Sequence, residues 1–101
     1  MARLLSELQA TLKGLEGVED AYITPPTSGM KYPCIMIEPD TSTASFADNV
    51  KYRFKRRYTI TVMDRNPDSL IPFQVESLPY SKFERFFRLN GLNHSVFQLF
   101  F

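Results

Sequence analysis

The feature that most constrains the fold of this chain is the dipeptide Asn90-Gly91 near its end. Asn-Gly is the preferred pair in a two-residue turn between antiparallel strands, because both residues readily adopt positive φ. Apolar and aromatic residues flank the turn, so residues 83–89 and 92–101 are predicted to form a β-hairpin.

The predicted hairpin is apolar on both faces. In its second strand strict alternation places Phe97 and Phe101 on one face and Phe100 on the other. Burying one phenylalanine side chain stabilises a fold by about 1.5–3 kcal/mol, so such a surface is rarely left in water. Two interpretations follow: a second subunit covers the spare face, or the aromatics fill a tight monomeric core. The residues assigned to this apolar interface or core are Phe86, Phe97, Phe100 and Phe101, with Phe83 and Phe87 expected on the face of the first strand opposite Phe86.

Residues upstream of the hairpin predict two helices and three strands. Leucines at helical spacing in residues 1–15 indicate an amphipathic helix that Gly14 and Gly17 end. Strands are predicted over residues 18–24, 33–38 and 50–63, the last with clear alternation of apolar and polar positions that Arg56 interrupts, which suggests a bulge or a bend. Ser69 is expected to cap a short helix that tolerates Pro72 in its first turn.

These elements predict an α+β fold. Its sheet is antiparallel or mixed, with four to five strands and two helices packed on one face, in the chain order α-β-β-β-α-β-β. A chain of 101 residues has the length of one domain, so residues 1–101 are expected to form a single unit.

Charge and cysteine content limit the kinds of partner. A formal net charge of +1 gives no overall field toward nucleic acid or an anionic membrane. The charged residues within the first fifteen indicate neither a signal peptide nor a membrane span. The lone Cys34 cannot form an internal disulfide, which fits assembly in a reducing cytoplasm.

The sequence offers no pattern typical of catalysis. Metal sites need clustered ligands, but His94 and Cys34 lie far apart with no second His or Cys. Neither a nucleophile elbow nor a glycine-rich phosphate-binding motif is present. No catalytic residue, metal or cofactor is therefore expected, and His94 is interpreted as a structural side chain near the hairpin turn.

A basic segment supports an alternative of another class. Residues 51–57 hold five cations in seven positions with aromatics interleaved, a composition typical of single-strand nucleic-acid binders. On a strand, however, the aromatics and most of the cations point to opposite faces, which favours a solvated or subunit-facing basic edge. A small nucleic-acid binding module that uses this strand remains the alternative.

The order of prolines, turn residues and aromatics resembles the small tail-terminator or tail-completion proteins of long-tailed, siphovirus-type bacteriophages. The resemblance extends over nearly the whole chain and rests on structural motifs. These are Met30-Lys31-Tyr32-Pro33-Cys34-Ile35, Phe46-Ala47-Asp48-Asn49 with Lys51-Tyr52, Arg57-Tyr58-Thr59-Ile60-Thr61-Val62, Asp64, Pro67-Asp68-Ser69, Ile71-Pro72, and Leu92-Asn93-His94 before Phe97 and Phe101.

The resemblance implies a ring of identical subunits, commonly hexameric in related proteins, that caps the finished tail tube and meets the head-side connector. It implies a virion protein that assembles in the host cytoplasm, with its own copies, the tail tube protein and the connector as partners and with DNA passing through the ring. A head-closure or connector component of the same neck is the nearest alternative. Leu70 and Phe73 depart from the pattern, because polar residues are expected on that helix. The subunit or tube contacts implied by position are Phe46, Asp48, Asn49, Lys51, Arg53, Lys55, Arg56 and Arg57.

Overall fold

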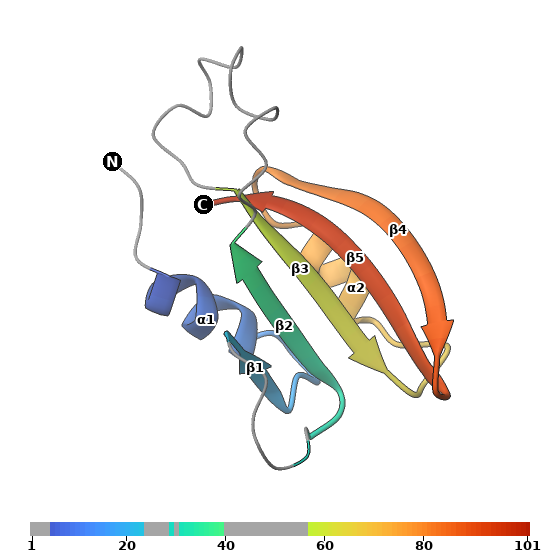
Figure 1. The fold of residues 1–101 in the computed structure, drawn as a ribbon. Helices are drawn as coiled ribbons and strands as arrows, with labels where there is room; N and C mark the ends of the chain where they lie inside the picture. The colour runs from blue at the N-terminus through green and yellow to red at the C-terminus, as the bar shows by residue number, and fades with distance from the viewer. Residues whose placement is uncertain (1–4, 24–28, 30, 40–56) are drawn as a thin grey trace.

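A computed structural model describes residues 5–23, 29, 31–39 and 57–101. The described chain has the expected α+β class (Figure 1). The predicted helix start at residues 1–4, the loop at 40–49 and the strand portion at 50–56 lie outside the described residues. In order, the elements are α1 (Leu5–Lys13), β1 (Asp20–Tyr22), β2 (Cys34–Pro39), β3 (Arg57–Asp64), α2 (Ile71–Glu76), β4 (Ser81–Leu89) and β5 (Leu92–Phe100).

The five strands form one mixed sheet in the spatial order β1-β2-β3-β5-β4. Only β1 and β2 run parallel, and the other neighbouring pairs are antiparallel. The last strand thus lies between β3 and β4, and the sheet edges are the three-residue β1 and the nine-residue β4. This spatial order was not predicted, because alternation within a strand says nothing about its neighbours.

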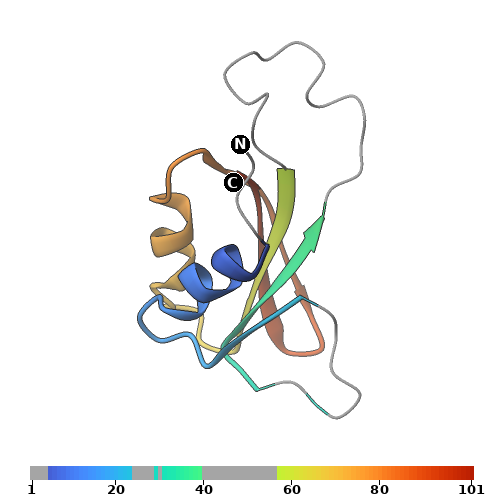
Figure 2. The same cartoon turned by 90° about the vertical axis from the view of Figure 1, so that its left-hand side faces the viewer.

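Both helices pack on the same face of the sheet, as predicted (Figure 2). Leu8 and Leu12 of α1 and Val75 of α2 meet the sheet residues Ile60 and Phe97 in one core cluster. Each of these side chains is at most 1% exposed. The predicted alternation is confirmed for β3, where Tyr58, Ile60 and Val62 are buried and the threonines between them are half-buried.

The helices end and begin close to the predicted signals. The N–H of Gly14 donates to the carbonyl of Ala10 at 3.0 Å, and Gly17 has φ 90°, a conformation that glycine adopts without steric cost. The prediction that Ser69 is the N-cap of α2 is wrong, because Leu70 occupies that position and makes no side-chain cap. The Ser69 hydroxyl nevertheless accepts the N–H of Ile71 at 3.3 Å, so it satisfies one of the orphan donors of the first turn.

The hairpin forms at the predicted turn, with φ 53° at Asn90 and 75° at Gly91. Phe83 and Phe87 were predicted to share one face of this strand, opposite Phe86. That prediction is wrong, because the register of β4 shifts between Phe83 and Arg85. Phe83 lies opposite Phe97 and Phe86 opposite Ser95, so both face the helix layer. Residues three apart share a face only because the bulge adds one residue. The interruption predicted at Arg56 lies outside the described residues.

Replacing Phe97 tests the position of the core. Phe97→Ala should lower the free energy of unfolding by about 3–5 kcal/mol, because it empties a site that is 1% exposed. Phe73→Ala is the matched control: this phenylalanine is 67% exposed, so its loss should change stability by less than about 1 kcal/mol. Urea unfolding at low protein concentration measures both values. Equal losses in the two variants would contradict this packing.

Candidate interaction surfaces

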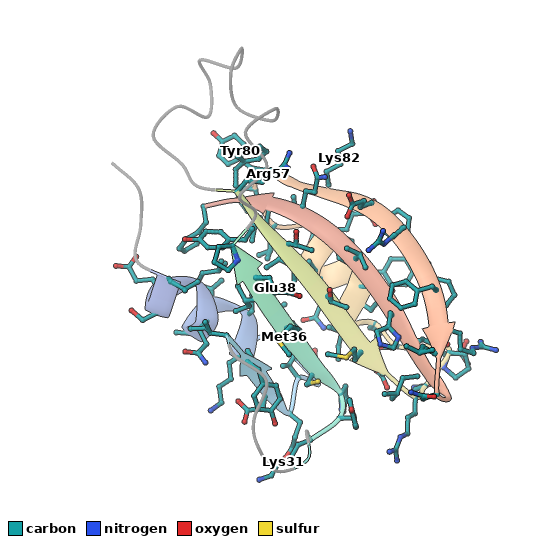
Figure 3. All side chains as sticks on the ribbon, viewed as in Figure 1. Lys31, Met36, Glu38, Arg57, Tyr80 and Lys82 are labelled. Atoms are coloured by element: carbon teal, nitrogen blue, oxygen red, sulfur yellow. The ribbon has the colours of Figure 1, made fainter. Side chains whose placement is uncertain are left out.

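The structure separates the residues that the sequence assigned to contacts. Phe97 and Phe101 are buried in the core, Phe100 is half-buried, and Phe86 is 55% exposed on β4. Arg57 begins β3 at the end of the sheet that also holds Tyr80 and Lys82 (Figure 3). The remaining predicted contact residues, Phe46, Asp48, Asn49, Lys51, Arg53, Lys55 and Arg56, lie outside the described residues.

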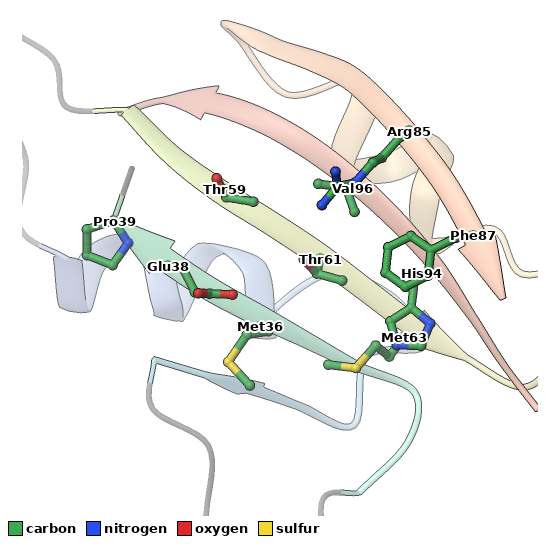
Figure 4. Close-up of a pocket in the computed structure, with 10 residues that line it drawn as sticks. All are labelled: Met36, Glu38, Pro39, Thr59, Thr61, Met63, Arg85, Phe87, His94 and Val96. Atoms are coloured by element: carbon green, nitrogen blue, oxygen red, sulfur yellow. The ribbon is translucent and has the colours of Figure 1, made fainter. Parts of the chain in front are cut away.

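The sheet face opposite the helices carries no described helix, and we call it the open sheet face (Figure 2). A shallow depression of about 530 Å³ crosses β2, β3, β5 and β4 on this face (Figure 4). Its lining is mixed: Met36, Met63, Val96 and Phe87 are apolar, whereas Thr59, Thr61, Glu38, Arg85 and His94 are polar. Such a mixture matches the composition of ordinary non-obligate protein interfaces.

One wall of the depression is an aromatic stack between neighbouring strands. The rings of Phe87 and His94 lie 4.5 Å apart and nearly parallel, at 13°. The guanidinium carbon of Arg85 lies 5.7 Å from the centre of the Phe87 ring. His94 Nδ1 lies 3.1 Å from the carbonyl oxygen of Leu92. These contacts fix His94 beside the hairpin turn.

A second apolar cluster forms the floor next to this wall. Cys34, Met36 and Met63 are buried together, with Tyr22 and Tyr32 packed against them. Burial, followed by the negative charges of Asp20 and Asp64, raises the pKa of the Cys34 thiol from 9.0 to about 11. The thiol therefore stays protonated and acts as a small apolar side chain.

The helix layer presents a different apolar surface, the helix-side patch of Leu70 and Phe73, which are 69% and 67% exposed. The position of α2 is fixed by two reciprocal hydrogen bonds: the N–H of Glu16 donates to Gln74 Oε1 at 2.9 Å, and Gln74 Nε2 donates to the Glu16 carbonyl at 2.8 Å. With Ile71 and Val75 turned into the core, Phe73 points outward. Both apolar residues that stand where polar ones were expected on this helix are thus exposed.

The β4 edge is the third exposed surface. Phe83, Phe86 and Leu89 are 46%, 55% and 56% exposed, and eight of its nine residues are classed as exposed. Phe83 makes an edge-to-face contact with Phe97, with ring centres 5.5 Å apart. β4 is therefore held by β5 along one edge and exposed along its other edge.

The described residues include no group of three or more His, Cys, Asp or Glu side chains placed to hold a metal ion. Within the same part of the chain, no helix has the length and apolar character needed to cross a membrane. Comparisons with protein-family models, with curated proteins and with solved structures found no match.

Sequence reasoning missed the depression on the open sheet face and the exposure of β4. The stack of Phe87 on His94 follows from the register of the two-residue turn, which places these residues opposite each other. The bulge between Phe83 and Arg85 moves Phe83, and not Phe87, to the other face of the strand, beside Phe97. No turn residue or alternation in the sequence marks this bulge. The exposed Leu70 and Phe73, in contrast, were visible as apolar residues outside the helical stripe.

The burial of Cys34 predicts a pH-dependent stability. Between about pH 9 and pH 11 the unfolded chain loses the thiol proton and the folded chain keeps it, so stability falls as pH rises through this window. Across it, the free energy of unfolding of the wild type should fall by on the order of 2 kcal/mol more than that of Cys34→Ala. Parallel pH profiles for the two proteins, measured by urea unfolding, would contradict a buried neutral thiol.

Proposed function

We propose that this chain is the subunit of a closed ring that caps the tail tube of a long-tailed bacteriophage and joins it to the head-side connector. The observation that supports a ring is the presence of two dissimilar surfaces on opposite sides of the molecule. The helix-side patch lies on one side of the sheet, and the depression of the open sheet face lies on the other. The role in the virion rests on the family resemblance.

A ring needs this arrangement. In a head-to-tail contact each subunit uses one surface toward its left neighbour and a different surface toward its right neighbour, and the series closes when the rotation closes. Phe73 and Leu70 project from the helix layer, whereas the open sheet face is hollowed and lined in part by Met36, Met63 and Phe87. We infer that the helix-side patch of one subunit packs into the depression of the next.

The partners follow from a capping role. Copies of the chain supply the ring, the tail tube protein meets one ring face, and the connector meets the other. Arg57 and the cations of residues 51–56 are the groups that would contact the tube or the DNA in the lumen. Immunolabelled particles would place the protein along the neck and separate this role from head closure.

Substitutions on each surface test the ring. Phe73→Glu and Thr61→Arg, each of which introduces a charge into the inferred contact, should raise the concentration needed for ring formation at least tenfold. Glu76→Gln, an exposed change on the same helix as Phe73, should leave it unchanged. Negative-stain images with purified tail tubes count the rings at tube ends.

Two outcomes would contradict the proposal in different ways. A wild-type chain that stays monomeric at about millimolar concentration with tail tubes present removes the ring itself. Rings that persist unchanged in both charged variants leave the ring but remove the inferred contact between the helix-side patch and the open sheet face.

A further inference from the structure

The two edges of the sheet are not equally available for pairing. At β1 the backbone of Ala21 is occupied by side chains: its N–H donates to Asp20 Oδ1 at 2.9 Å, and its carbonyl accepts from Gln9 Nε2 at 2.8 Å. Lys13 lies over the same edge, 3.7 Å from Asp20. An edge whose backbone groups are already bonded does not add another strand.

The β4 edge has the opposite character. No described strand lies beyond it, and it is exposed over nearly its whole length. Alternate residues of an edge strand direct their N–H and C=O groups away from the sheet, where they are open to a further strand. Cations and a bulge on an edge strand usually deter pairing with another chain. The β4 edge has both, but it also carries exposed phenylalanines, which such deterrence does not require.

We propose that β4 pairs antiparallel with β4 of a second copy in a two-fold dimer that continues the sheet from one chain into the other. The register of this pairing follows from the bulge. Strands joined about a two-fold axis place same-face residues opposite each other, and the bulge puts Phe83 and Phe86 on one face. Phe83 of each chain therefore lies opposite Phe86 of the other, on the helix side.

The same register matches the charges on the open side. Glu84 of each chain falls opposite Arg85 of the other, and Lys82 opposite Phe87, which gives two ion pairs and two cation–π contacts. Gln98 already donates to one Glu84 oxygen at 3.0 Å, and the second oxygen remains available. A shift by one residue would place Arg85 opposite Arg85, so the bulged register is the one in which charge and apolar contacts agree.

The dimer is expected to be weak. Each half-exposed phenylalanine contributes on the order of 100 Å². Six of these and the remaining strand surface reach only the low end of the area that stable interfaces bury, about 1,200 Å². A dissociation constant in the micromolar range follows. Because an isologous contact uses one surface twice, this pair is separate from the head-to-tail ring and concerns chains that are not in a ring.

A charge reversal within β4 tests the pairing. The experiment uses the full chain carrying Phe73→Glu, so that ring contacts are blocked, and measures sedimentation equilibrium up to about 100 µM, above the expected constant. This parent should dimerise. Adding Glu84→Arg should raise the dissociation constant at least tenfold, because like charges then oppose each other. Adding Arg85→Glu as well should restore it, because each ion pair re-forms with its signs exchanged.

Three outcomes overturn the proposal: a parent that stays monomeric, a Glu84→Arg chain that dimerises as well as the parent, or a swapped chain that does not recover. Glu76→Gln, outside β4, is the matched control and should leave the constant unchanged. Equal melting temperatures of the parent and the Glu84→Arg chain, measured well below the expected dissociation constant where both are monomers, confirm that an exposed substitution left the fold intact. Failure here leaves the ring untouched, because ring formation is measured on a chain with an unmodified Phe73.

Discussion

The structure depends on β5, which lies inside the sheet and is buried on both of its faces. Its Phe97 and Leu99 join the core under the helices, and its Val96 and His94 are buried on the open sheet face. A strand of this kind needs cover on both sides, and the described residues provide two short helices, both on one side. On the other side, Met63 of β3 and Arg85 and Phe87 of β4 line the depression together with Val96 and His94. The shallow depression and the exposed aromatics of β4 follow from this one-sided cover.

Much of the fold could be predicted from local patterns. Asn90-Gly91 marked the hairpin, the leucines of the first helix marked its buried stripe, and the alternation of Tyr58, Ile60 and Val62 marked the inner face of β3. These signals are local because turn chemistry and side-chain period act over a few residues. The insertion of β5 between β3 and β4 and the bulge in β4 are decided by contacts between distant segments, which no local pattern contains.

Because local patterns do not contain contacts between distant segments, the sequence alone left two interpretations of the apolar hairpin open. Its aromatics were divided between a tight core and an interface, and the structure assigns them individually: Phe97 and Phe101 to the core, and Phe83 and Phe86 to the surface. The core interpretation is confirmed for Phe97 and Phe101, and cover of the exposed Phe83 and Phe86 by a second subunit stays a prediction. The bulge decides which face Phe83 occupies, because without it Phe83 and Phe86 would lie on opposite faces of β4.

The central claim is that neighbouring chains cover the open sheet face and the helix-side patch together. Hydroxyl-radical footprinting of the free chain and of the chain assembled on tail tubes tests it most directly, because the method reports the solvent exposure of individual side chains. Leu70 and Phe73 on one side and Phe87 on the other should all lose reactivity on assembly. Protection confined to the helix layer, with Phe87 as reactive as in the free chain, would contradict the account.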